Sequence, residues 1–334
     1  MAPNNPSRVI VVTDAWYPQT NGVVVHVDAL CRAVERQGVQ VDILHPGLFP
    51  RTILPQYPEI ELATTPWHLS AHGDFAQVDF VHVPTEGPLG IAARFLCGRR
   101  NICFSTAVHT KFPEYAQILA GIPVSWGYSF LKWFHRPAHV TLVQTNSQRQ
   151  ELSERGFPHL QVLGSGVDTE RFRVMSHSPR TEPVLLFVGR VSKEKNIQAF
   201  LDLAIPATKV VVGDGPDLTR LTKLYPMVEF RGYRFGEELV AEYANANVLV
   251  FPSLTDTFGL TAVEAMACGT PVAAYPVTGP LDLVEEGITG SVNDDLAVAV
   301  QTALQLNRDR VREQSLRFSW DNIALNFLAA HQGR

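Results

Sequence analysis

Two carboxylates in the second half of the chain have the spacing to hold a long polar ligand. Asp256 lies in a polar loop after the apolar run 248–251, and Glu264 follows on a predicted helix. At a rise of about 1.5 Å per residue, Glu264 lies one to two turns below the loop, roughly the span from the sugar to the ribose of a nucleotide diphosphate sugar. A solvated Asp and an ordinary helical Glu explain the pair equally well. Backbone N–H groups at the helix start can face a diphosphate, and they belong to Phe258, Gly259 and Leu260.

Two cations lie in a loop that follows another apolar run, 184–188. The loop reads GRVSKEKN and contains Arg190 and Lys195. At the carboxyl end of a strand these side chains suit a diphosphate, because Arg offers a planar fork of donors and Lys a compact charge. A plain surface loop could also carry them. Three further residues at predicted strand ends are Gly189, Gly215 and Tyr233.

The first half of the chain begins with a predicted strand, 9–13, and a loop, DAWYPQTNG, that runs from Asp14 to Gly22. A dinucleotide-binding fold would place Gly-x-Gly-x-x-Gly here, and its absence disfavours a dehydrogenase. His109 follows another predicted strand, 103–108, and open parallel sheets bind ligands at the carboxyl ends of their strands. A lone histidine after a strand is also a common hydrogen-bonding residue, and Gly22 could simply make the turn.

Length and composition indicate a two-domain α/β protein. The chain has 334 residues, of which 46% are hydrophobic and 18% charged, with a net charge of −5. Alternating strands and helices predict parallel sheets covered on both faces, and the mild charge gives no indication of nucleic-acid binding. The four cysteines lack metal-like spacing and are expected to be reduced core residues of a cytosolic protein. Neither a run of 18 apolar residues nor a cleavable leader is found, so no membrane span is expected.

Several strings resemble those of family-4 retaining glycosyltransferases, which share the two-domain GT-B fold. The most specific is FPSLTDTFGLTAVEAMACGTPVAAY, and GRVSKEKN, TDAWYPQTNGVVVHV, STAVHTKFPEY and GSGVDTERF are also similar. The resemblance implies two Rossmann-like doubly wound domains with a donor cleft between them. The expected parts are residues 1–166, a linker 167–182, residues 183–316 and a C-terminal crossover helix 317–334.

The resemblance also implies roles for the residues above. Arg190, Lys195, the Gly22 amide and the helix start would stabilise the departing diphosphate. Asp256 would hold sugar hydroxyls, Glu264 the ribose hydroxyls, and His109 the sugar near its 6-position. Asp256 replaces the commoner Glu of the family, and its shorter reach leaves the donor sugar open. The remaining residues of the predicted donor site are Asp14, Gly189, Gly215, Tyr233, Phe258, Gly259 and Leu260.

No metal or other cofactor is expected, because the sequence contains no Asp-x-Asp triplet. Metal-dependent transferases of the other main fold usually need that triplet. The charge of the leaving group would then be met by protein groups. No side chain is an obvious nucleophile, which fits the same-face attack of family members that retain configuration.

The acceptor is indicated by residues 87–136, which combine six basic residues with one acid, Glu114. Basic residues among aromatics at helical spacing suit a surface that rests on anionic lipid, whereas a core-facing helix with a solvated basic face is the simpler interpretation. The two interpretations differ in whether the Trp and Phe side chains point outward. The residues are Arg94, Arg99, Arg100, Lys111, Lys132 and Arg136, with Phe112, Tyr115, Ile118, Leu119, Ile122, Trp126, Phe130, Leu131, Trp133 and Phe134.

The strings look most like the bacterial subgroup of GDP-mannose-dependent mannosyltransferases and glycosyl-diacylglycerol synthases. The expected activity is therefore transfer of glucose, glucuronic acid or mannose from a nucleotide diphosphate sugar to a membrane lipid. A soluble or polysaccharide acceptor, a nucleotide-sugar epimerase of the same fold and a non-catalytic sugar-nucleotide binder are the alternatives. The expected location is the cytoplasm, with peripheral contact to the inner face of the plasma membrane if the acceptor is a lipid.

Overall fold

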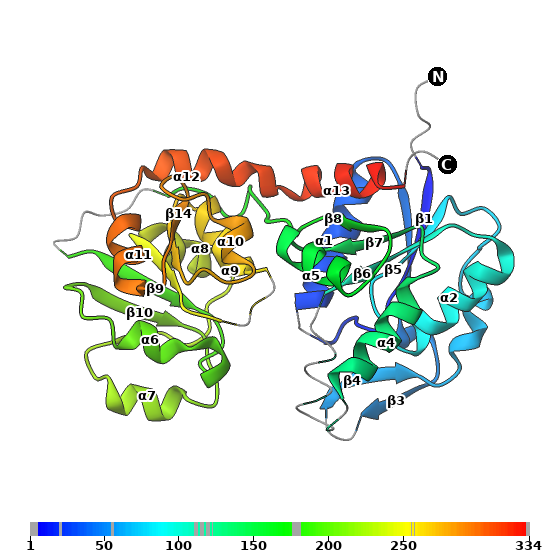
Figure 1. Ribbon diagram of the computed structural model, residues 1–334, viewed down its shortest axis with the longest axis horizontal. Coiled ribbons are helices and arrows are strands. Elements are labelled where there is room, and N and C mark those ends of the chain that lie inside the picture. Colours follow the sequence, from blue (N-terminus) through cyan, green and yellow to red (C-terminus); the bar gives the residue numbers. More distant parts are fainter. Residues whose placement is uncertain are drawn as a thin grey trace. The chain divides into compact units, whose positions relative to one another are not determined.

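The structure is a computed structural model that describes residues 6–19, 22–54, 57–109, 113, 117, 121, 123–175, 182–254, 256 and 258–331 (Figure 1). The chain divides into two compact units. Unit 1 comprises Met1–Ser165 and Trp320–Arg334, and unit 2 comprises Gly166–Ser319. Each unit contains one parallel sheet of six strands.

The sheet of unit 1 has the strand order β2-β1-β5-β6-β7-β8, and every neighbouring pair is parallel. Short β-branched runs form its centre, and four of the five residues of β1 are buried, as expected for a parallel strand covered on both faces. The strands are β1 (Arg8–Val12), β2 (Gln40–Leu44), β5 (Phe80–Val83), β6 (Phe104–Val108), β7 (Val140–Val143) and β8 (Leu160–Val162).

Alternation along β1 divides the core of unit 1 into two layers. Val9 and Val11 pack with α1 (Gly22–Arg36) and α13 (Trp320–Ala329). Ile10 and Val12 face the other side and pack with α2 (Pro88–Arg100) and with Phe134 of α4 (Val124–His135). Helix α5 (Asn146–Glu154) links β7 to β8. Because successive side chains of a strand point to opposite faces, one short apolar run supports both layers.

The sheet of unit 2 has the order β11-β10-β9-β12-β13-β14, again all parallel. This is the strand order of a doubly wound dinucleotide-binding fold. Its strands are β9 (Val184–Val188), β10 (Thr208–Val212), β11 (Glu229–Phe230), β12 (Val248–Phe251), β13 (Val272–Ala274) and β14 (Gly290–Val292). Its helices are α6 (Ile197–Leu201), α7 (Leu218–Leu224), α8 (Gly236–Asn245), α9 (Leu260–Ala267), α10 (Pro280–Leu283), α11 (Leu296–Ala303) and α12 (Arg308–Ser315).

Helices cover both faces of this second sheet. Leu186 of β9 packs in one layer with α8, α9 and α12, and Leu185 and Phe187 pack in the other with α6, α7 and α11. The predicted α/β architecture with two doubly wound parallel sheets is confirmed. Among the described residues, no helix is long and apolar enough to cross a bilayer.

Some features differ from the sequence-based expectation. An antiparallel hairpin of β3 (Arg51–Leu54) and β4 (Tyr57–Ala63) was not predicted. The described part of the expected linker 167–182 belongs to unit 2, where Val167 and Phe172 are buried in the core. The last helix begins at Trp320 and packs on α1 of unit 1, where Arg36 and Asp321 form an ion pair.

Candidate active site

The strand order of unit 2 reverses between β9 and β12, and a doubly wound sheet forms its ligand crevice at such a point. The loops that follow these two strands are joined there by an ion pair. Lys195 Nζ lies 2.5 Å from Asp256 Oδ1, and the side-chain amide of Asn196 donates to the carbonyl of Pro252 at 3.1 Å. Two residues that are 61 positions apart in the sequence are therefore neighbours at the carboxyl edge of the sheet.

Glycines allow the loops after β9 and β10 to pack backbone to backbone. A Cβ atom at Gly213 would lie 2.0 Å from the carbonyl oxygen of Gly189, and one at Gly215 would lie 2.4 Å from that of Val191. Arg190 lies in the same loop segment, and its side chain is exposed. Arg190 thus follows β9 in a loop whose backbone is closely packed.

Helix α9 starts at the same edge. Its N-cap, Gly259, has a φ of +105°, a conformation that favours glycine, and Phe258 before it is buried. The helix begins at Leu260, so its first-turn N–H groups and the positive end of its dipole lie just beyond the Asp256 loop. Arg190, Lys195 and a helix N-terminus therefore belong to segments at the carboxyl edge of this sheet, and groups of these kinds suit an anion.

Glu264 lies one turn further along α9 and is held by a tyrosine. The hydroxyl of Tyr243, on α8, donates to Glu264 Oε2 at 2.7 Å. Burial raises the pKa of Glu264 to about 7, and the Tyr243 hydrogen bond opposes that rise. In the part of the chain that the structure describes, the other carboxylate oxygen, Oε1, accepts no hydrogen bond.

Two exposed aromatic rings follow β11. Tyr233 and Phe235 stack with ring centroids 5.8 Å apart and an interplanar angle of 23°. Exposed large aromatic surfaces of this kind offer a flat platform for a ligand ring.

In unit 1, polar residues also follow the strands, but they bond to one another. The order of this sheet reverses between β1 and β5, and there Asp14 accepts hydrogen bonds from the backbone N–H groups of Leu89 and Gly90 at the start of α2 and from the Thr85 hydroxyl. Burial raises the pKa of Asp14 to about 6, although these hydrogen bonds lower it. Asp14 thus caps a helix inside unit 1.

His109 follows β6 and lies in a cluster of neutral polar groups. Its Nδ1 is 3.1 Å from Nε2 of Gln144, and its ring lies 4.8 Å from that of His26. His26 Nδ1 is in turn 2.9 Å from the Ser165 hydroxyl. Burial lowers the pKa of His109 to about 4 and that of His26 well below its usual value, so both rings are neutral near pH 7.

Comparisons with known proteins identify both halves of the chain as parts of a glycosyltransferase. Residues 20–171 match the model of "Glycosyltransferase Family 4", and residues 182–309 match that of "Glycosyl transferases group 1". The chain is a glycosyltransferase with a family-4 domain followed by a group-1 domain. The prediction of the family from sequence strings is therefore confirmed, as is hexosyl transfer from a nucleotide sugar as the activity class.

Two curated relatives of this glycosyltransferase illustrate the range of the family. A GDP-mannose-dependent alpha-mannosyltransferase of Mycobacterium tuberculosis is 28% identical over 313 residues, covering 85% of this chain and 82% of the relative. An alpha-monoglucosyldiacylglycerol synthase of Streptococcus pneumoniae is 25% identical, covering 95% and 83%. A solved sucrose-phosphate synthase of Thermosynechococcus elongatus superposes with a TM-score of 0.73 over 96% of this chain at 20% identity, which shows the common GT-B fold.

The structure brings together only part of the predicted glycosyltransferase site. Lys195, Asp256, Arg190 and the start of α9 share one edge of unit 2, together with Glu264 deeper on the helix. Gly22 is the exposed first residue of α1, and a Cβ there would meet none of the described atoms within 4 Å. The roles of all these residues in binding a donor stay predictions.

Asp14 makes structural hydrogen bonds that the sequence did not reveal. It was predicted to bind the donor, yet both of its carboxylate oxygens already accept hydrogen bonds from groups in unit 1. A Cβ at Gly87 would lie 2.5 Å from its Cγ, so the loop before α2 is closely packed on it. The geometry favours a structural role for this carboxylate.

Two polar partners were missed by sequence reasoning, Tyr243 and Gln144. Tyr243 lies on the buried face of α8 and would be taken for an ordinary core residue. Gln144 directly follows β7, and that position at a strand end was the signal that could have found it, because β6 and β7 are neighbouring strands.

Proposed function

We propose that this glycosyltransferase moves a hexose from a nucleotide diphosphate sugar to a lipid acceptor at an anionic membrane surface, with retention of configuration and without a metal. The donor part of the proposal rests on the edge of unit 2. The acceptor part rests on an exposed aromatic and basic surface of unit 1. That surface is the observation that favours a lipid over a soluble acceptor.

The edge of unit 2 has the groups to stabilise a departing diphosphate. As the bond between the anomeric carbon and the diphosphate oxygen breaks, the electron pair passes to the diphosphate. Arg190, Lys195 and the first-turn N–H groups of α9 would meet this charge. Such fixed donors stabilise the transition state more than the ground state, because the charge on the leaving oxygen increases as the bond breaks.

Lys195 and Asp256 would contact the two groups on either side of the donor's reacting bond. Lys195 is expected to turn to the diphosphate and Asp256 to the sugar hydroxyls, and the 2.5 Å pair keeps both side chains at the switch point beforehand. Glu264, with Tyr243 bound to Oε2, keeps Oε1 for the ribose hydroxyls. The stacked rings of Tyr233 and Phe235 suit the base.

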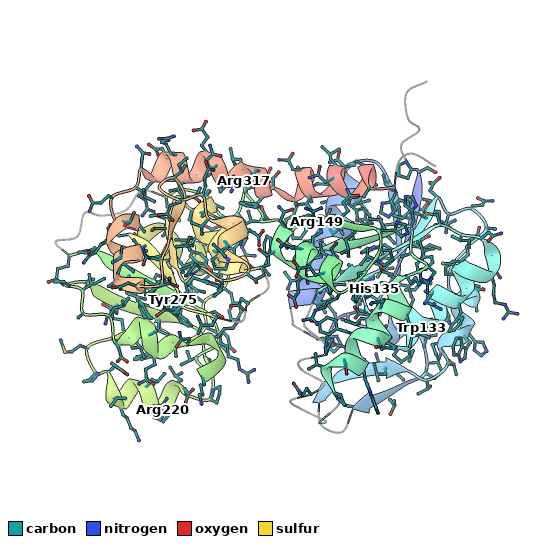
Figure 2. The ribbon with its side chains drawn as sticks, in the orientation of Figure 1. Trp133, His135, Arg149, Arg220, Tyr275 and Arg317 are labelled. Atoms are coloured by element: carbon teal, nitrogen blue, oxygen red, sulfur yellow. The ribbon has the colours of Figure 1, made fainter. Side chains whose placement is uncertain are left out.

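The aromatic patch comprises Trp67, Phe95, Phe130 and Trp133, contributed by η2 (Pro66–Ala71), α2 and α4. Of these residues, Trp133 is labelled in Figure 2. Successive ring centroids are 6.2 Å apart from Trp67 to Phe95, 6.0 Å from Phe95 to Trp133 and 5.8 Å from Trp133 to Phe130. Trp67 is 66% exposed and Trp133 42%. The guanidinium of Arg94 lies 4.1 Å from the Trp133 ring.

Helix α4 has features of both interpretations, because some of its aromatic side chains are buried and others are exposed. Tyr128, Leu131 and Phe134 of α4 are buried, but Trp133 points outward, and Trp126 on the same helix is 70% exposed. Among the aromatic and apolar residues predicted for the lipid surface, Phe112, Tyr115, Ile118, Leu119 and Ile122 lie outside the described residues, as do Lys111 and Glu114.

Charge complementarity favours an anionic lipid surface as the occupant of the patch. The sequences of α2 and α4 contain no Asp or Glu, and Arg99, Arg100, Lys132 and Arg136 lie at their carboxyl ends. Aromatic rings suit the membrane interface, and each basic residue near an anionic surface contributes about 1 kcal/mol. The Streptococcus pneumoniae relative is named as a synthase of a glycosylated diacylglycerol, which supports the same choice.

The experiment is a transfer assay with GDP-mannose and UDP-glucose as donors, and with diacylglycerol in anionic vesicles, diacylglycerol in neutral vesicles, or soluble hexoses and maltose as acceptors. We expect labelled sugar in the lipid fraction, with a higher rate on anionic vesicles and a lower rate as salt screens the charges. Replacing Arg99, Arg100 and Lys132 together by Ser should weaken vesicle binding roughly 10- to 100-fold.

A matched control comes from unit 2. Arg220 and Lys223 on α7 and Arg310 on α12 are exposed, and replacing all three by Ser removes the same charge and should leave vesicle binding unchanged. Transfer to the soluble acceptors only, with the protein remaining in the supernatant at low salt, would contradict the lipid acceptor. A chelator should leave the rate intact, and loss of activity with EDTA that magnesium or manganese restores would contradict the metal-free mechanism.

A further inference from the structure

His109 is held by a glutamine at the end of the neighbouring strand. β6 and β7 pair at Val108 and Val143, so the next residues, His109 and Gln144, lie beside each other at the sheet edge. The Gln144 side-chain nitrogen, Nε2, is 3.1 Å from His109 Nδ1. A carboxamide nitrogen only donates, so Nδ1 of the histidine accepts and carries a lone pair.

Gln144 is itself fixed by a second glutamine. Its backbone N–H donates to Gln148 Oε1 at 2.7 Å, and Gln148 Nε2 donates to the carbonyl of Val108 at 3.3 Å. Gln148 lies in the first turn of α5, where its backbone N–H donates to the Thr145 hydroxyl. Both glutamines are buried. The ends of β6 and β7 are thus fastened together around the histidine.

A neutral imidazole with its lone pair at Nδ1 carries its proton at Nε2. That Nε2 is buried, and it has no hydrogen-bond partner among the residues that the structure describes. Burial keeps the pKa of His109 near 4, while the Glu86 carboxylate raises it. The other titratable groups that face it are His26, on α1, and His82, on β5, whose pKa values burial also lowers. A buried N–H donor without a partner costs stability unless a ligand supplies an acceptor.

We propose that Gln144 is a positioning residue for glycosyl transfer, which holds His109 as an Nε2–H donor for an oxygen of the donor sugar. This role rests on the proposed function, because it requires that the sugar reaches His109. The arrangement resembles that of other catalytic histidines, in which the hydrogen bond at one ring nitrogen decides what the other can do. Gln144 then contributes to recognition of the sugar without touching it.

The tautomer is tested without any ligand. Nitrogen-15 NMR of the His109 ring, assigned with a His109→Asn variant, distinguishes a protonated Nε2 from a protonated Nδ1. We expect the Nε2–H form in the wild type throughout pH 6 to 8. An Nδ1–H ring would overturn the proposal, and this measurement needs no substitution at Gln144.

Gln144→Glu tests the consequence for binding. The new carboxylate accepts from Nδ1–H, so the neutral ring moves its proton away from Nε2, and the carboxylate raises the pKa of His109. The readout is the affinity for GDP-mannose divided by that for GDP, and likewise for UDP-glucose and UDP, because this ratio cancels the titration of Glu264 at the ribose. At pH 8 the ratio should fall about tenfold in the variant, as for loss of one hydrogen bond. It should recover toward pH 6, where the imidazolium again offers Nε2–H.

Gln150→Glu is the matched control. Gln150 lies on the exposed side of α5, where its amide donates to Glu154, and the same chemical change there should leave the ratio unaltered. An unchanged ratio in Gln144→Glu at pH 8, or an equal fall in Gln150→Glu, would overturn the proposal. If the wild type binds neither sugar nucleotide, the proposed function fails instead, and the spectrum still decides the tautomer.

Discussion

The carboxyl edges of the two parallel sheets of this glycosyltransferase have similar topology but carry different side chains. In unit 2 the groups that follow the strands are charged, as with the exposed Arg190 and the Lys195–Asp256 ion pair. In unit 1 they are neutral or satisfied internally, as with His109 and Asp14. The same topology therefore supports two tasks. Under the proposed function, unit 2 would meet the charge of a diphosphate and unit 1 would offer uncharged hydrogen-bond donors to a sugar.

The largest effect on turnover is expected from removing the cations of unit 2. Lys195→Ala and Arg190→Ala should each lower turnover by about two to three orders of magnitude, as loss of one donor to a developing negative charge typically does. Steady-state kinetics with the donor identified in the transfer assay measures this. Gly22→Ala, at a position with room for a Cβ, gives a mild comparison in unit 1. Turnover close to wild type in both cation variants would remove the phosphate assignment.

A fall in pH should destabilise unit 1 before it destabilises unit 2. The pKa values of His26, His82 and His109 are lowered by burial, so the stability that these groups contribute is present above their unfolded pKa of about 6.5 and is lost as the pH falls toward the folded values. His109 alone accounts for about 2 kcal/mol between pH 6.5 and 5. Asp14 opposes this, because its raised pKa stabilises the fold as the pH falls below about 6.

Tryptophan fluorescence can follow that loss in unit 1 alone. All five tryptophans of the chain, Trp16, Trp67, Trp126, Trp133 and Trp320, belong to unit 1. Urea titrations at pH 7.5 and 5.0 should therefore show a lower midpoint at the acid pH. An equal or higher midpoint at pH 5.0 would mean that the buried histidines do not set the stability of this unit.

A stability effect with the opposite pH dependence is expected from Glu264→Gln in unit 2. Because the folded pKa of Glu264 is raised to about 7, its contribution to stability is complete below the unfolded pKa of about 4.5 and is lost as the pH rises through 7. The neutral amide can still accept from the Tyr243 hydroxyl. The variant should thus need about 3 kcal/mol more free energy to unfold than the wild type at pH 8, and about 1 kcal/mol or less more at pH 5.

The same variant should bind the nucleotide about tenfold more weakly, since a charged acceptor for the ribose is lost. Tyr243→Phe is the variant for comparison. It removes the hydroxyl that holds Glu264 but keeps the ring in the core. Circular dichroism in urea and titration with GDP and UDP measure the two effects. A Glu264→Gln protein that is less stable at pH 8 would contradict the burial argument.

The fold was predictable because the strands are short β-branched runs separated by helical patterns. The run 184–188 was predicted as a strand, and β9 (Val184–Val188) has the same bounds. The hairpin of β3 and β4 was missed because its sequence, with Arg51 and Glu61 paired across the strands, lacks such a buried run. The local sequence pattern thus predicted the central sheets but not this peripheral hairpin.

The candidate site was predictable as a set of residue types and less so as a set of contacts. GRVSKEKN and the loop of Asp256 indicated a phosphate and sugar site separately, but their ion pair depends on β9 and β12 being neighbours. Tyr243 reaches Glu264 only because α8 packs beside α9. Gln144 reaches His109 through strand register. Partners that arise from packing between distant segments leave no spacing signal in the sequence.

Hydrogen exchange with and without GDP or UDP tests most directly whether the donor's diphosphate binds at the edge of unit 2. The account predicts that saturating nucleotide slows exchange in residues 189–196 and 258–264, while the Asp14-capped start of α2 in unit 1 is unchanged, and that Lys195→Ala abolishes the protection at the same nucleotide concentration. Saturating nucleotide that protects unit 1 and leaves residues 189–196 and 258–264 exchanging at their free rate would contradict it.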